Sequence, residues 1–211
     1  VEKLASASII QSPTIRDAMV KVDRANYAVS RSGAYNDNPQ LIGYGQTISA
    51  PHMHAHALEV LLPALVERAH DYPEDDLNIL DVGCGSGYLT ACFGRMVDRD
   101  GEGPIPPLVK GKVYGIDVFP ELVSFTTSNI NKEDGDLFDS GTIQLKVGDG
   151  WVGLPEASPF HAIHVGAAAA TCPEHLMMQL AVGGVMVCPV GPDGGFQNLY
   201  RIEKIKDSQT Y

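Results

Sequence analysis

The sequence predicts an α/β fold: a Rossmann-like, doubly wound and mostly parallel sheet with an N-terminal helical extension. Three observations carry this prediction. Short apolar segments alternate with helical patterns after residue 77, a glycine-rich turn joins the first of these segments to the first helix, and two further helical patterns precede residue 70. Such alternation favours a parallel sheet with helices on both faces.

Residues 1–70 are predicted to carry two helices. Ser12 and Pro13 form a helix-start signal, and a second helix is expected after Ser49-Ala50-Pro51, with Pro63 kinking it or ending its first segment. A polar, glycine-containing stretch, residues 30–45, lies between the two helical patterns. We expect one domain over residues 1–211, in which this part covers the functional site.

Residues 77–211 are predicted to form the sheet and its helices. Strands are expected at 78–82, 112–117, 142–147, 160–165, 185–190 and 198–205, and helices at 88–97, 120–131 and 173–181. Three prolines and three glycines within residues 98–111 predict an inserted surface loop.

Composition and charge limit the class of protein. The 211 residues are 44% hydrophobic and 19% charged, which is typical of one globular domain. A net charge of -11 without a Lys/Arg cluster argues against nucleic-acid binding. No run of eighteen apolar residues and no secretory signal is found, so we expect no membrane partner and a cytoplasmic location. The four cysteines lack a C-x-x-C pair and are expected to be free thiols.

The glycine-rich turn indicates a nucleotide-like ligand. Gly83, Gly85 and Gly87 follow an apolar strand that ends with Asp81 and Val82, and they precede a helical pattern. Side-chain-free positions let the backbone approach a ligand, and the helix N-terminus offers unpaired N–H groups. The dinucleotide fingerprint requires a small residue where Tyr88 stands, so we favour S-adenosylmethionine. A nicotinamide-dependent oxidoreductase is the alternative.

An acid stands at the end of each of the next two strands. The carboxylate of Asp117 is suited to accept hydrogen bonds from both hydroxyls of a ribose, and a helix cap ahead of Pro120 is the alternative. Asp149 is suited to the exocyclic amine of adenine, with the N–H of Gly150 beside it. A simple Asp-Gly turn is the alternative at that position.

The fourth strand ends in a run of small residues, with no polar side chain between Val165 and Thr171. Methyltransferases that act on DNA bases commonly place an Asp/Asn-Pro-Pro-aromatic group there, so this sequence disfavours that class. Small side chains at this position would let another backbone lie close to the end of the strand. The alternative is that these residues form a turn whose small size is required only for packing.

Ser49 and the histidines that follow it admit several interpretations. Ser49 stands where the N-cap of the second helix is expected. His52 and His56 have the spacing of metal ligands on a helix, but no cysteine or acid pair completes a set, so we expect no metal. A serine hydrolase is disfavoured because no G-x-S-x-G elbow is present.

Several blocks taken together resemble the protein-L-isoaspartate O-methyltransferase family, in order and over nearly the whole chain. The most specific blocks are T-I-S-A-P-H, residues 47–52, and P-V-G-P-x-G-G, residues 189–195. The resemblance also covers residues 81–87, 147–150 and 164–168. It implies a class I S-adenosylmethionine-dependent methyltransferase fold with a modified strand order at the sheet edge. The implied reaction is methylation of the side-chain carboxyl of L-isoaspartyl, and also D-aspartyl, residues in damaged proteins, yielding S-adenosylhomocysteine.

The resemblance also implies roles for individual residues. Ser49 is similar to the family's proposed active-site residue and His54 to its cofactor-contacting histidine. Cofactor binding is implied for Gln46, Thr47, Ile48, Ser49, His54, Asp81, Gly83, Gly85, Gly87, Asp117, Asp149 and Gly150. Substrate binding is implied for Ile48, Ser49, Val165, Gly166 and Ala167.

The implied partners are isoaspartyl proteins and peptides, and we expect a monomer. A small-molecule carboxyl methyltransferase and a non-catalytic cofactor-binding adaptor are the alternatives. Relatives usually carry a further C-terminal segment that contributes to the cofactor pocket, whereas this sequence ends at Tyr211. Either the C-terminal segment was removed from this chain, or the cofactor pocket is less closed than in those relatives.

Overall fold

The computed structural model describes residues 1–98, 110–192 and 195–205. Most of the predicted loop at 98–111 therefore lies outside the described residues. The helices are α1 (Glu2–Ser6), α2 (Pro13–Lys21), α3 (Pro51–Asp71), α4 (Tyr88–Val97), α5 (Pro120–Glu133), α6 (Asp136–Asp139) and α7 (Glu174–Met178), with 3-10 turns η1 (Arg24–Asn26) and η2 (Pro155–Ala157). The strands are β1 (Gln40–Gly43), β2 (Gln46–Ile48), β3 (Leu77–Val82), β4 (Gly111–Asp117), β5 (Ile143–Val147), β6 (Phe160–Val165), β7 (Leu180–Val190) and β8 (Asn198–Glu203).

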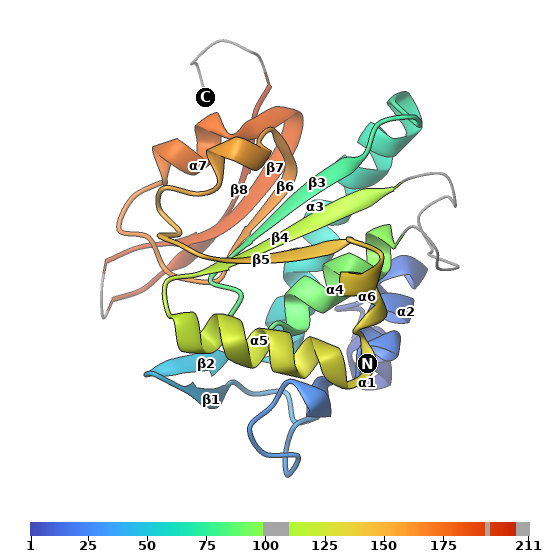
Figure 1. The fold of residues 1–211 in the computed structure, drawn as a ribbon, viewed down its shortest axis with the longest axis vertical. Helices are drawn as coiled ribbons and strands as arrows, with labels where there is room; N and C mark the ends of the chain where they lie inside the picture. Colours follow the sequence, from blue (N-terminus) through green and yellow to red (C-terminus); the bar gives the residue numbers. More distant parts are fainter. Residues whose placement is uncertain (99–109, 193–194, 206–211) are drawn as a thin grey trace.

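The main sheet has the strand order β5-β4-β3-β6-β7-β8 (Figure 1). Its first five strands are parallel, and β8 pairs antiparallel with β7. The chain moves outward from β3 to β5 and then crosses to β6 on the other side of β3. Ligands of open α/β sheets bind at the carboxyl ends of the strands where the order reverses. The predicted mostly parallel sheet is confirmed, and its switch point lies between β3 and β6.

Both faces of the sheet are covered, which makes it doubly wound. Alternate residues of β3 enter different cores: Leu77 and Ile79 pack with α3 and α4, whereas Leu80 and Val82 pack with α7. This period of two is what a strand buried on both faces requires. The helices α5 and α7 lie on opposite sides of the sheet in Figure 1.

Three segments differ from what their local patterns indicated. The polar residues 30–45, where no strand was predicted, contain β1, which forms an antiparallel hairpin with β2. Of the two alternatives for Pro63, an end of the first helical segment is wrong, because α3 continues to Asp71 while its leucines on either side of the proline are buried. The helix expected at 173–181 ends at Met178, since Leu180 already pairs with Phe160 in the sheet. In each case tertiary burial outweighs the local pattern.

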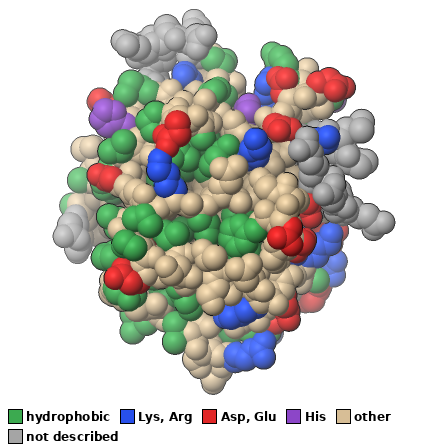
Figure 2. All heavy atoms as spheres, viewed as in Figure 1, with side chains coloured by type: hydrophobic (Ala, Val, Ile, Leu, Met, Phe, Trp, Pro, Cys, Tyr) green, Lys and Arg blue, Asp and Glu red, His purple; other side chains and the backbone are tan. Residues whose placement is uncertain are grey.

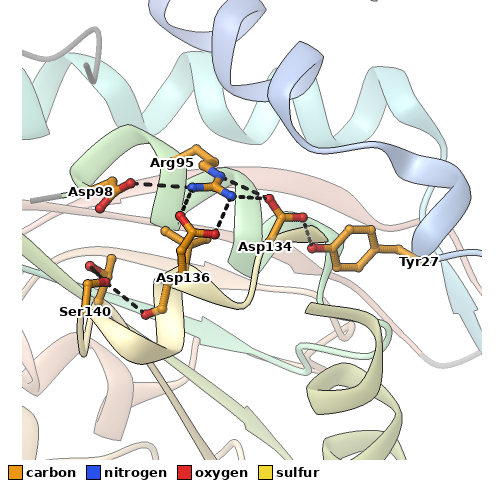
Figure 3. Close-up of polar contacts among 8 residues, drawn as sticks. Tyr27, Arg95, Asp98, Asp134, Asp136 and Ser140 are labelled. Atoms are coloured by element: carbon orange, nitrogen blue, oxygen red, sulfur yellow. Dashed lines mark hydrogen bonds and ion pairs between the residues drawn. The ribbon is translucent and has the colours of Figure 1, made fainter. Parts of the chain in front are cut away.

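A buried polar network ties the N-terminal part to the sheet domain (Figure 3). The carboxylate of Asp134 accepts hydrogen bonds from the Tyr27 hydroxyl at 2.6 Å and from Arg95 Nη2 at 2.8 Å. The Asp134 side chain is only 1% exposed. Burial and the Asp134 charge raise the pKa of Tyr27, so its hydroxyl remains a donor. Arg95 also binds Asp136 at the surface.

His161 on β6 gives the fold a predictable sensitivity to acid. Burial and the nearby charge of Arg68 lower the pKa of His161 to about 4. The unfolded chain therefore binds more protons between pH 6.5 and pH 4, and the free energy of unfolding falls as the pH drops through this range. His161 should account for about 2 kcal/mol of that loss, after allowance for partial solvent screening.

Urea unfolding at pH 7 and pH 4.5 tests this expectation. The loss of stability on acidification should be smaller in His161→Gln than in the wild type. His70→Gln is the matched control, since the His70 side chain is 87% exposed. An equal loss in wild type and His161→Gln would contradict the assignment.

Candidate functional site

The site lies at the carboxyl ends of β3, β4 and β6, beneath the β1–β2 hairpin, and consists of two adjoining cavities. The outer cavity, about 390 Å³, lies between the hairpin and the ends of β4 and β5. The inner cavity, about 40 Å³, lies between α3, α4 and the end of β3. Thr47, Gly83, Gly85 and Gly166 line both cavities, so the two lie side by side, and together they are called the cleft below.

The three glycines of the turn all have left-handed backbones, with φ of +74°, +60° and +87°. At Gly87 a Cβ atom would lie 2.5 Å from Thr126 Cγ2, so a side chain there would displace α5. Gly83 and Gly85 line both cavities, whereas Gly87 lines neither and caps the N-terminus of α4. The predicted glycine loop therefore divides into two lining residues and one residue that sets the turn.

Asp117 is buried at the end of β4 and lines the outer cavity. Its carboxylate accepts hydrogen bonds from the backbone N–H groups of Gly85 and Phe119, each at 3.1 Å. The N-cap of α5 is Phe119, so the helix-cap alternative for Asp117 is wrong. A carboxylate offers about four acceptor positions. Asp117 thus retains acceptor capacity toward a ligand while it holds the glycine turn against β4.

Asp149 and Gly150 also line the outer cavity. The Asp149 carboxylate accepts a hydrogen bond from the N–H of Trp151 at 2.9 Å, so the predicted Asp-Gly turn is present at the cavity edge. Trp151 lines the same cavity. The two interpretations of this segment are therefore compatible: the turn brings an acid and an indole ring to the outer cavity.

Asp81 lies in the wall of the inner cavity and is engaged by side chains of the protein. It is 1% exposed, accepts from Thr90 Oγ1 at 2.5 Å, and lies 2.8 Å from His164 Nδ1. Each oxygen of this carboxylate therefore has one partner. The contact with Asp81 orients the ring of His164, which lines the inner cavity.

The segment before α3 covers the cleft. Gln46 lines the outer cavity, Thr47 lines both, and Ile48, Ser49 and His54 line the inner one. The N-cap of α3 is Ala50, so the N-cap interpretation of Ser49 is wrong. Because Pro51 occupies the first helical position, the cap falls one residue later than expected. The Ser49 carbonyl instead accepts a hydrogen bond from Arg24 Nη2 at 2.7 Å.

The structure brings most, but not all, of the expected site residues together. Gly166 and Ala167 line the outer cavity, whereas Val165 is buried within the sheet and lines neither cavity. The cavities are also lined by residues that were not predicted from the sequence: Val82, Cys84, Ser86, Tyr88, Leu89, Ile116, Val118, Phe119, Trp151 and His164. Their positions near the carboxyl ends of strands β3 to β6, or in the turn and helix start that follow β3, are the signal that was available.

No metal centre is formed among the residues that the structure describes. There, no group of three or more His, Cys, Asp or Glu side chains is placed to hold a metal ion. His52 instead contacts Asp37 at 2.8 Å, and its ring lies 6.4 Å from that of His56. All four cysteines are free, as expected. No helix among the described residues is long and apolar enough to cross a membrane.

The parallel sheet with its glycine turn and the acids at the ends of β4 and β5 defines a class I S-adenosylmethionine-dependent methyltransferase. The family model for protein-L-isoaspartate(D-aspartate) O-methyltransferase matches residues 1–211. The chain belongs to this family, as the resemblance in its sequence blocks implied. Enzymes of the family methylate isoaspartyl residues in damaged proteins and thereby initiate their repair.

Individual relatives agree with this assignment. A protein-L-isoaspartate O-methyltransferase of Triticum aestivum is 41% identical over all of this chain and 83% of its own length. The Caenorhabditis elegans enzyme is 40% identical over 97% of this chain and 82% of its own length. A Plasmodium falciparum crystal structure assigned to the family, in complex with S-adenosyl-L-homocysteine, superposes with a TM-score of 0.82 at 32% identity, covering 98% of this chain and 88% of that one.

The residues present fit S-adenosylmethionine. The outer cavity combines two carboxylates with the apolar surfaces of Phe119 and Trp151, which suits a nucleoside with ribose hydroxyls and an aromatic base. The narrower inner cavity begins at the shared glycine turn and contains the polar rings of His54 and His164. The outer cavity, with Asp117 and Asp149, thus suits the adenosine half, and the inner cavity suits the amino-acid half.

Proposed function

We propose that this chain transfers the methyl group of S-adenosylmethionine to the side-chain carboxylate of L-isoaspartyl and D-aspartyl residues in damaged proteins and peptides. The observation that carries the proposal is that the two cavities share Thr47 and the glycine turn, with Ser49 in the lining of the inner one. This arrangement supports a cofactor site whose reacting end lies near the family's proposed active-site serine.

The outer cavity is proposed to hold the adenosine half of the cofactor. Asp117 accepts hydrogen bonds from the ribose hydroxyls, and Asp149 with Gly150 binds the adenine edge. Gly83 and Gly85 allow close approach of the backbone, while Gly87 sets the turn. Gln46, Thr47 and Ile48 cover the ligand, and His54 and Asp81 belong to the wall around its amino-acid half.

The acceptor is proposed to lie against Ser49 and Ile48 on one side and the end of β6 on the other. Gly166 and Ala167 are exposed there, so an extended peptide backbone can pass close to the sheet. Val165, buried within the sheet, supports this edge through its backbone. The small residues at 166–169 leave that approach unobstructed.

The chemistry requires positioning rather than proton transfer. A carboxylate acceptor is already ionised at pH 7 and needs no general base. The bound cofactor supplies a sulfonium methyl group as the electrophile. Ser49 orients the acceptor carboxylate by a hydrogen bond, and the covering segment holds water away from the reacting charges. Rate enhancement then comes mainly from alignment of the two reactants.

We further propose a monomer that acts in the cytoplasm without a nucleic-acid partner. The net charge of -11 supports the last point. On the face shown in Figure 2, the Lys and Arg side chains are scattered among acidic and neutral ones. Such a surface does not form the continuous basic patch that phosphate backbones require.

The activity is tested with labelled S-adenosylmethionine and paired peptides that differ only in an isoaspartyl or a normal aspartyl linkage. Label should enter the isoaspartyl peptide and be released on base treatment, as expected of a methyl ester. Transfer to free small carboxylic acids but not to the peptide would favour a small-molecule methyltransferase. Cofactor binding without any transfer would favour the adaptor alternative.

Replacing Ser49 by alanine should lower kcat about tenfold, because one hydrogen bond to a charged acceptor is lost. The dissociation constant of S-adenosylhomocysteine should change less than twofold. Ser124→Ala, on the exposed surface of α5, is the matched control. An unchanged kcat in a folded Ser49→Ala enzyme would remove Ser49 from the reacting centre.

A further inference from the structure

Arg24 is a buried cation beside the cleft, and its position in the sequence indicates no role. The residue is 4% exposed, and none of its contacts in the described part of the chain is an ion pair with a carboxylate. Its Nε donates to the Ala34 carbonyl at 2.9 Å, and its guanidinium carbon lies 5.3 Å from the centre of the Tyr88 ring. Burial lowers its pKa, and the group still remains charged at neutral pH.

The other two nitrogens of Arg24 hold two residues of the inner cavity. Nη2 donates to the carbonyl of Ser49 at 2.7 Å, and Nη1 lies 3.3 Å from Nδ1 of His54. The planar guanidinium therefore connects the covering segment to α3 in one fixed geometry. A shift of Arg24 would move the Ser49 backbone and release the His54 ring together.

The contact with His54 determines which ring nitrogen carries the proton. A guanidinium has only donors, so Nδ1 of His54 must be the acceptor. His54 is buried, and burial together with the Arg24 charge holds its pKa well below the usual value, so the ring is neutral. The single proton of the neutral ring is then on Nε2. His54 lines the inner cavity, where this N–H is its remaining polar group.

We infer that Arg24 is a positioning residue for the methyl-transfer site, which fixes His54 as an Nε2–H donor toward the amino-acid half of the cofactor and fixes the backbone of Ser49. This inference rests on the proposed function for the identity of the ligand. A fixed N–H donor backed by a buried positive charge suits a carboxylate, which the amino-acid half carries. The adenosine half lies in the other cavity and is independent of Arg24.

The first test measures the His54 tautomer in the unmodified, ligand-free protein. Long-range ¹H–¹⁵N correlation spectra should show His54 with an unprotonated Nδ1 and a protonated Nε2 at pH 7. The spectrum of His54→Gln assigns the signal among the seven histidines. A protonated Nδ1 in the wild type would overturn the inference, whether or not any Arg24 variant folds.

The second test compares two ligands in Arg24→Lys. Lysine keeps the positive charge but cannot contact Ala34, Ser49 and His54 in the fixed geometry of the guanidinium. S-adenosylhomocysteine should bind about tenfold more weakly than to wild type, whereas 5′-methylthioadenosine, which lacks the amino-acid half, should bind within twofold. Equal weakening of both ligands, or of neither, would overturn the inference. Trp151, the only tryptophan, lines the outer cavity and reports binding by its fluorescence.

Arg68→Lys is the matched control. Arg68 also lies over a tyrosine ring, at 3.6 Å from the centre of Tyr72, and also contacts a histidine, but it lines neither cavity. The Arg68→Lys substitution should leave the affinities for both ligands unchanged. If the wild type binds S-adenosylhomocysteine with the expected tautomer but does not methylate isoaspartyl peptides, the proposed function fails while the Arg24 geometry stands.

Discussion

Replacing Asp117 by alanine is expected to raise the dissociation constant of S-adenosylhomocysteine about a hundredfold, since the role proposed for its carboxylate is to accept two hydrogen bonds from the ribose. The same change removes the acceptor of the Gly85 and Phe119 N–H groups, which holds the glycine turn against β4. Asp117→Asn keeps the size and one acceptor oxygen and should lose only about tenfold. Titration of the Trp151 fluorescence measures both variants.

Asp139→Ala, exposed on α6, is the control for the loss of a negative charge and should bind like the wild type. Thermal unfolding of Asp117→Ala distinguishes lost contacts from a lost fold. Wild-type affinity in a folded Asp117→Ala protein would exclude Asp117 as the ribose ligand.

Replacing Asp134 by alanine should lower the free energy of unfolding by about 3–5 kcal/mol. The change leaves the fully buried Tyr27 hydroxyl without its acceptor and removes the two hydrogen bonds that Asp134 accepts from the Nε and Nη2 of Arg95 (Figure 3). Removing one partner of a buried charged network costs more than the network contributes, because the remaining groups stay desolvated. Urea unfolding measures the loss.

Asp136→Ala is the matched control, because Asp136 binds the same arginine but its side chain is 58% exposed. It should cost less than about 1 kcal/mol. Asp134→Ala combined with Tyr27→Phe should cost less than the sum of the single changes, since the two groups share one hydrogen bond. A loss no larger than that of Asp136→Ala would show that the network does not hold the N-terminal part in place.

Much of the sheet domain could be predicted because its signals are local. The segment from Leu77 to Val97 contains an apolar run, a glycine turn and a helical pattern, and the structure places the strand and the helix start within one residue of the expectation. The acids Asp117 and Asp149 were found because strand ends in a parallel sheet share one edge. Each of these inferences needs only the neighbouring residues and the rule for parallel sheets.

The remaining features depend on distant parts of the chain. The β1–β2 hairpin was missed because its strands are only four and three residues long and mostly exposed. Its turn residue Tyr44 stacks on Phe119, 75 positions later. Leu180 joins a strand because Phe160 is beside it. The role of Arg24 is invisible in the sequence, where it is one of the charged residues of a short polar stretch.

The sequence by itself determined the main strands and helices of the parallel sheet and the glycine turn, because hydrophobic periodicity and turn chemistry act between neighbouring residues. The family followed from the sequence blocks that resemble it. Only the tertiary structure decided which polar groups are buried together. It placed Arg24 against Ser49 and His54, turned the Asp81 carboxylate toward His164 and Thr90, and left Val165 within the sheet. Loss of water makes those pairings specific, and which groups lose water is set by the packing of segments far apart in the chain.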